Sequence, residues 1–349
     1  MSRRRRLIVA LSGAASITLA VVLIVTLTGN ATPVRQTSGS FPHVAPPPLP
    51  HLRVPPPKGP LRSPFTGERI KKPGPVLVAK IDNIVYARPQ TGLASADIVY
   101  VLPVEGGLSR FEVVFSSRFP KVIGPVRSAR EDDLELLKQF GRPAFAYSGA
   151  APHLLPFIHR ARIADLYAGI TSGYFRSGAR IAPYNLYADT SVLMSQAKHA
   201  SVARDIGFRF AATPPPGGRA ITSYSASYPA ASYTFRWSAK DQRWLVWIDG
   251  APARAAEGGQ LGGKTVVIQY TVIRTSRFLE YGFPPPFAQS DGSGRAVVLR
   301  NGRAYTVRWS RRSPNGGTVY TLRNGQRMTF AVGQVWVMFA GKWPRNSPR

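Results

Sequence analysis

The first strong hydrophobic signal is an uncharged apolar run from residue 7 to about residue 27, preceded by four consecutive arginines. A run of this length can cross a bilayer, and the positive-inside rule keeps the arginine block in the cytoplasm. We interpret residues 1–31 as an uncleaved transmembrane anchor. A cleaved signal peptide is the alternative, because residues 29–31 include the small side chains that signal peptidase requires. In both cases nearly all of the chain is expected to lie outside the cytoplasm.

The anchor is followed by a proline-rich stretch over residues 32–63. Proline fixes its backbone and lacks an N–H donor, so this composition favours extended polyproline II. We interpret the stretch as a spacer that holds a folded region away from the membrane.

Between residues 64 and 210, hydrophobic runs typical of strands alternate with runs of helical period. Strands are predicted at 76–81, 97–104, 110–116 and 144–148. Helices are predicted after Ser128, after Pro152 and over 190–205; Ser128 and Glu131 have the spacing of a capping box. The alternation predicts an N-terminal α/β-type domain.

The helical period disappears after a proline–glycine boundary at residues 213–218. Residues 233–237, 244–248 and 265–273 alternate between apolar and polar positions, as strands do. Hairpin turn signals recur at Asp249-Gly250, Asn301-Gly302, Asn315-Gly316 and Asn324-Gly325. Residues 219–341 are therefore predicted to form a mostly antiparallel β domain, followed by a tail over 342–349. The predicted fold class is α+β.

Composition narrows the possible partners. Lys and Arg total 46 against 17 Asp and Glu, a formal net charge of +29. Such a charge favours polyanions, and the predicted location outside the cytoplasm argues against nucleic acid as the partner. The chain has no Cys, which excludes disulfides, thiolate metal sites, Cys nucleophiles and a lipidated Cys.

Several ordered motifs carry a family resemblance. They are 81–83 (Ile-Asp-Asn), 87–93 (Ala-Arg-Pro-Gln-Thr-Gly-Leu), 96–100 (Ala-Asp-Ile-Val-Tyr), 104–111 (Val-Glu-Gly-Gly-Leu-Ser-Arg-Phe), 123–130 (Ile-Gly-Pro-Val-Arg-Ser-Ala-Arg) and 182–187 (Ala-Pro-Tyr-Asn-Leu-Tyr). Further matching positions are Gly294, Gly302, Trp309, Gly325, Gly333 and Trp336. Through them the chain resembles the YerB-like family of bacterial envelope lipoproteins, over everything that follows the proline-rich stretch.

The resemblance implies membrane attachment and two extracytoplasmic domains, without an assigned activity. This chain departs from the family at three points. The lipid-bearing Cys is missing, so residues 7–27 would be the anchor. Tyr184 and Tyr147 stand where family members often carry His, which argues against a mechanism that needs those imidazoles.

The catalytic candidates are Asp82, Asp97 and Glu105, which lie near strand ends where functional groups often gather. A pair of carboxylates can perform acid–base chemistry if one of them has a raised pKa. The alternative, which we favour, is that they bond turn backbone or pair with nearby arginines.

The ligand-binding candidates combine arginines with polar side chains from the same motifs. They are Arg88, Arg110, Arg127, Ser128, Arg130, Arg180 and Asn185, with Arg176 beside them. Converging guanidinium groups suit phosphate or carboxylate groups, whereas a scatter of solvated charges would bind nothing specifically. No metal or cofactor motif occurs, so neither a metal site nor a cofactor is expected.

These observations favour a single-pass membrane protein of the cell envelope that binds an anionic cell-wall polymer or an envelope protein. Whether it is an enzyme stays open. The alternative is a hydrolase or phosphotransferase that acts on a cell-wall precursor, and a scaffold is a third possibility. Oligomeric state cannot be read from the sequence.

Overall fold

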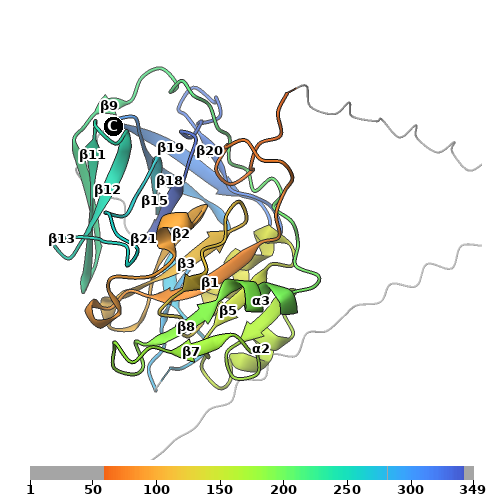
Figure 1. Cartoon of the computed structure of the whole chain (residues 1–349). Coiled ribbons are helices and arrows are strands. Elements are labelled where there is room, and N and C mark those ends of the chain that lie inside the picture. Colours follow the sequence, from red (N-terminus) through yellow and green to blue (C-terminus); the bar gives the residue numbers. More distant parts are fainter. Residues whose placement is uncertain (1–58, 281, 342–349) are drawn as a thin grey trace, which may run out of the picture. The chain divides into compact units, whose positions relative to one another are not determined.

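The computed structural model describes residues 59–280 and 282–341 (Figure 1). The predicted anchor, most of the proline-rich stretch and the tail lie outside these residues. Within the described residues, no helix is both long and apolar enough to cross a bilayer.

The described residues are organised around an eleven-stranded sheet. Its main path runs β20 (Val319–Thr321), β19 (Arg303–Arg311), β18 (Gly292–Arg300), β15 (Thr265–Tyr270), β21 (Val335–Ala340), β2 (Ile98–Pro103), β3 (Ser109–Phe115), β1 (Leu77–Asp82), β5 (Ala144–Tyr147) and β6 (Ala164–Tyr167). The eleventh strand, β9 (Arg219–Ala220), pairs with β19. The predicted strands at 76–81, 97–104, 110–116 and 144–148 are confirmed as β1, β2, β3 and β5.

The sheet runs without interruption from the N-terminal half of the chain into the C-terminal half. The junction is a parallel pairing of β2 with β21, in register from Ile98 opposite Val335 to Val101 opposite Met338. β21 is also parallel to β15, and β1, β5 and β6 are mutually parallel. The fold is therefore mixed α/β, and the segments 64–210 and 219–341 share their central sheet.

A smaller antiparallel sheet packs on one face of the large one. It contains β10 (Ser223–Tyr228), β11 (Ala231–Ser238), β12 (Arg243–Ile248), β13 (Ala251–Pro252) and β14 (Gly262–Gly263). Alternate side chains such as Phe235 and Trp244 are fully buried in one core with Trp336 of the large sheet. At the hairpin between β18 and β19, Asn301 and Gly302 have φ of 48° and 69°, as a two-residue turn with left-handed backbone requires.

The helices are short: α1 (Glu131–Leu136), α2 (Leu155–His159) and α3 (Thr190–Gln196). Leu136 of α1 and Ile158 of α2 are buried in a second core on the opposite face, whereas Leu193 of α3 belongs to the same core as the small sheet. Two small sheets complete the fold, one of β4 (Val122–Ile123), β8 (Leu186–Asp189) and β7 (Tyr174–Arg176), the other of β16 (Ile273–Thr275) and β17 (Pro286–Ala288). Single 3₁₀ turns lie at Val85–Ala87, Leu93–Ser95, Glu105–Gly107 and Leu137–Phe140.

Two helix predictions need correction. Ser128 is not the N-cap of α1; Arg130 is, and its backbone N–H donates to the Asp133 carboxylate over 2.7 Å. The helix predicted over 190–205 ends at Gln196. It stops because the following residues pair with another segment: the Val76 N–H donates to the Ser201 carbonyl and the Ala203 N–H to the Gly74 carbonyl.

A cluster of four buried charged residues lies between α1 and the sheet. Lys80 of β1 and Glu112 of β3 are opposite each other in register, and both are fully buried. Lys80 forms an ion pair with Asp133, whereas Asp132 accepts a hydrogen bond from the Ala288 N–H. Burial, together with the charge of Asp133, raises the pKa of Glu112 well above its usual range and that of Asp132 to about 7.

We predict that Asp132→Asn stabilises the protein above neutral pH. The pKa of Asp132 is about 7 in the folded protein and 3.8 as the ordinary value. As pH rises, Asp132 therefore ionises in the unfolded state before it ionises in the folded state. The free energy of unfolding of the wild type falls over this pH range for that reason. The difference between these two pKa values lowers the free energy of unfolding by at most about 4 kcal/mol. Urea unfolding should show wild type and variant equally stable at pH 4 and the variant more stable at pH 8. A variant that is less stable at pH 8 would contradict this assignment.

Candidate functional site

A concave site of about 520 Å³ opens beside the carboxyl ends of β5 and β6. We call it the basic basin. Its lining includes Arg127 and Ser128, Ser148 just after β5, Ala168 just after β6, and Phe175 and Arg176 of β7. Loops at the carboxyl ends of parallel strands are where α/β sheets commonly place their ligands.

Backbone hydrogen bonds fix the segment that carries Arg127. The Arg127 N–H donates to the carbonyl of Lys80 in β1, and the Ser148 N–H donates to the Arg127 carbonyl. On the other side, the Val126 N–H donates to the Leu186 carbonyl. The segment is therefore held between β1, the end of β5 and β8, which makes the position of Arg127 a consequence of the sheet.

Two guanidinium groups line the basic basin, and no Asp or Glu is among its lining residues. Arg127 forms an ion pair of 2.9 Å with Asp82 and lies 5.7 Å from the centre of the Tyr184 ring. Arg176 is exposed, and its Nη1 donates to the Asn185 side-chain oxygen over 2.7 Å. Among the described residues Arg176 has no carboxylate partner, whereas the charge of Arg127 is already balanced by Asp82.

Arg110 lies buried behind the Arg127–Ser128 segment. Its Nη1 donates to the Ser128 carbonyl over 2.8 Å, and its Nε has no hydrogen-bond partner among the described residues. Burial and the charge of Arg130 lower the pKa of Arg110 to about 10, so the guanidinium remains protonated at neutral pH. Arg110 thus adds positive charge close to the basic basin without lining it.

Four other predicted ligand-binding residues make contacts within the protein. Arg130 is almost fully buried, binds Glu105 at 2.5 and 2.9 Å and has Glu280 at 3.4 Å. Arg88 pairs with Asp249 at 2.8 Å, and Arg180 donates to the Pro89 carbonyl at 2.6 Å. The Asn185 amide bonds Arg176 and the Ser177 carbonyl. None of these four lines the basic basin.

The three carboxylate candidates all have local partners. Asp82 pairs with Arg127 and accepts the N–H of Asn83 at 2.8 Å. Burial alone would raise the pKa of Glu105, but the hydrogen bonds and charge of Arg130 outweigh it, and the pKa is lowered. Burial raises the pKa of Asp97, which accepts the N–H groups of Ser116 and Ser117 and lies at the start of β2, away from the ends of β5 and β6.

Exposed aromatic and aliphatic side chains accompany the basic basin. Phe175 lines it and is 45% exposed, stacked 6.0 Å from Tyr187. Tyr184, under Arg127, lies 5.7 Å from the ring of Tyr86, which is 62% exposed. Flat exposed rings next to guanidinium groups form a surface on which sugar rings can stack.

Sequence reasoning missed two groups of polar residues. One is the buried cluster of Lys80, Glu112, Asp132 and Asp133, whose members gave no local motif. The other is the ion pair of 2.5 Å between His159 and Asp165, which are too far apart on the chain to mark a helix-face pair. No group of three or more His, Asp or Glu side chains in residues 59–280 and 282–341 is arranged to hold a metal ion.

The chain is similar in sequence and in fold to a protein of Bacillus subtilis. "Putative lipoprotein YerB" of Bacillus subtilis (strain 168) is 24% identical over 301 residues, 79% of this chain and 85% of the relative. The crystal structure of YerB protein from Bacillus subtilis matches with a TM-score of 0.68 at 21% identity, over 81% of this chain and 97% of that chain. The two proteins therefore share a fold.

Two family models match consecutive parts of the chain and together span most of it. Residues 65–203 match "Protein of unknown function (DUF3048) N-terminal domain", and residues 223–337 match "Protein of unknown function (DUF3048) C-terminal domain". The YerB-like resemblance predicted from the motifs is thereby confirmed, and the chain belongs to the DUF3048 family.

Proposed function

We propose that this is an envelope protein, attached to the cell membrane through residues 7–27, that binds an anionic glycopolymer of the cell wall in the basic basin. The observation that carries the proposal is that Arg127 and Arg176 line one concave site in which no carboxylate is a lining residue. A ligand with phosphate or carboxylate groups would supply a negative partner for Arg176, since Arg127 is already paired with Asp82.

The envelope location draws support from the sequence and from the relative. The Bacillus subtilis protein carries the name "Putative lipoprotein YerB", and lipoproteins are held at the membrane by a lipid on Cys. This chain has no Cys, and its apolar run over residues 7–27 offers another means of attachment.

The lining suits a polymer of charged sugars better than a bare ion. Guanidinium groups hold the anionic groups, the hydroxyls of Ser128 and Ser148 can bond sugar hydroxyls, and Phe175 offers a ring face.

The hydrolase alternative draws less support. A general base needs a free carboxylate near the bound substrate. Asp82 and Glu105 are instead held by Arg127 and Arg130, and the lowered pKa of Glu105 makes it a weak base. A protein partner would use exposed apolar groups such as Ile170 and Ile181, and neither of these lines the basic basin.

Arg176→Gln should weaken retention on phosphate-bearing wall polymer several-fold, because it removes an exposed charge that contacts the ligand. Co-sedimentation of the full chain with purified wall polymer across a salt series measures this, and retention should fall steeply as salt screens the charges. Arg162→Gln removes another exposed charge, outside the basic basin, and is the matched control. Equal losses in the two variants, or retention that salt does not change, would contradict the proposal.

Arg130→Gln should instead destabilise the fold, because it leaves Glu105 and Glu280 partly buried without their cation. The expected loss is about 2–4 kcal/mol in the free energy of unfolding, measured by urea denaturation. Arg176→Gln should change that free energy by less than about 0.5 kcal/mol. If both variants unfold at the same urea concentration as the wild type, the division between structural and ligand-binding arginines is wrong.

A further inference from the structure

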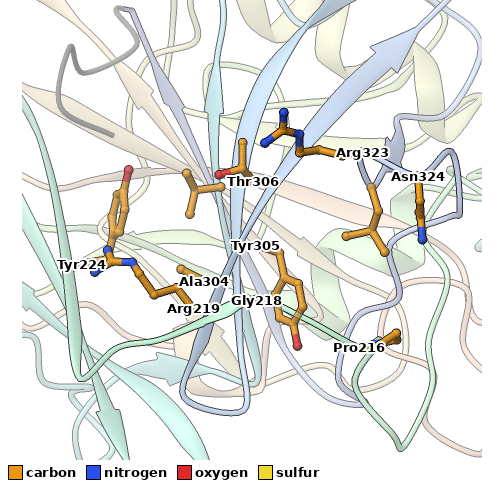
Figure 2. A pocket seen from close by; sticks show the side chains of 11 residues that line it. Pro216, Gly218, Arg219, Tyr224, Ala304, Tyr305, Thr306, Arg323 and Asn324 are labelled. Carbon is orange, nitrogen blue, oxygen red and sulfur yellow. The ribbon is translucent and has the colours of Figure 1, made fainter. Parts of the chain in front are cut away.

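A second concave site lies at the edge of the large sheet, in the C-terminal half of the chain. β19 pairs along this edge with β9 at Arg303 and Ala304, and with β20 at residues 308–310. Between these pairings lies a pocket of about 340 Å³ (Figure 2). It is bounded on one side by the proline–glycine segment that sequence analysis marked as a boundary, residues 213–218.

Hydrogen bonds to β19 hold this segment in place as one wall of the pocket. Tyr305 donates its hydroxyl to the Pro215 carbonyl over 3.1 Å, and Arg303 Nη1 donates to the Gly218 carbonyl over 2.8 Å. Gly218 has φ of 74°, and a Cβ there would come within 2.6 Å of the Tyr305 ring. Only glycine therefore allows the segment to lie so close to β19, and the contact fixes where the next residue, Arg219, begins.

Two arginines approach the pocket from different parts of the chain. Arg219 follows the proline–glycine segment, and Arg323 lies in the turn after β20 (Figure 2). Within residues 59–280 and 282–341, neither guanidinium has an ion pair or a hydrogen bond, and no Asp or Glu lines the pocket. By contrast, the neighbouring Arg300 is fully buried and donates to the carbonyls of Thr329 and Ala211.

The rest of the lining is aromatic and apolar. Tyr224 presents its ring, and its hydroxyl is fixed 3.0 Å from that of Tyr270. Val297, Ala304 and Leu322 add apolar surface. An aromatic ring, an apolar surface and two guanidinium groups match a small molecule that has both a ring and a negative group.

The geometry points to a second ligand site, in which a single sugar bearing a phosphate or carboxylate group lies against Tyr224 with its negative group at Arg219, while Arg323, on the other side of the pocket, adds positive charge (Figure 2). The volume fits one charged monosaccharide rather than a stretch of polymer. None of the residues of this site belongs to the basic basin, so its occupancy does not depend on the function proposed above.

Isothermal titration calorimetry of the full chain in mild detergent tests this site. The probes are glucose 1-phosphate, glucuronate, neutral glucose and inorganic phosphate. Arg219→Gln and Arg323→Gln each remove one pocket guanidinium, and both positions are exposed, so folding should be unaffected. Arg312→Gln removes an exposed charge outside the pocket and serves as the matched control.

We expect saturable binding of glucose 1-phosphate or glucuronate, weakened about tenfold or more by Arg219→Gln, less by Arg323→Gln, and unchanged by the control. The preferred probe identifies the negative group as phosphate or carboxylate. Arg176→Gln should leave this binding intact, which separates the two sites. No saturable binding, equal binding of inorganic phosphate, or an equal loss in Arg312→Gln would overturn the inference.

Discussion

The parallel pairing of β2 with β21 is the constraint on which the rest of the structure depends. It joins strands from opposite ends of the chain at the middle of the large sheet, and Tyr100 stacks on Phe339 across the junction with 6.0 Å between ring centres. Because β2 pairs with β3, and β3 with β1, this junction also sets the position of the parallel strands β1, β5 and β6. The basic basin lies at the ends of those strands, so its geometry depends on both halves of the chain.

Local neutralisation decides which positive charges are available to a ligand. A formal charge of +29 suggests a surface that binds anions everywhere. Instead, Arg88 and Arg130 are paired with acids, and Arg300 and Arg311 are buried against backbone carbonyls. Considering residues 59–280 and 282–341, guanidinium groups without a carboxylate partner are found at Arg176 in the basic basin and at Arg219 and Arg323 in the second pocket. The function we propose follows from this uneven distribution rather than from the total.

Much of the fold could be predicted from local pattern. The strands at 76–81 and 244–248 were predictable because their apolar runs and alternation reflect burial directly. The start of α1 was not predictable. The N-cap is Arg130, whose backbone N–H donates to the Asp133 carboxylate, and not Ser128. The shared sheet could not be predicted either, since no local signal sets the register of Ile98 against Val335.

The site was predictable only in part, for a similar reason. The motif over 123–130 contains Arg127 and Ser128, which line the basic basin. The motif could not show that Arg127 lines the basic basin while Arg130 is paired within the protein. Glu280, one partner of Arg130, comes from a distant hairpin of the C-terminal half. Sequence shows which residues carry charge, whereas tertiary packing shows which charges are already paired.

Hydrogen–deuterium exchange of the full chain, with and without purified wall polymer, tests the central claim most directly. The account predicts that polymer slows exchange in residues 126–128 and 174–176, which form the basic basin, and leaves the β2–β21 junction unchanged. Protection spread evenly over basic segments, or absent from these two, would contradict it.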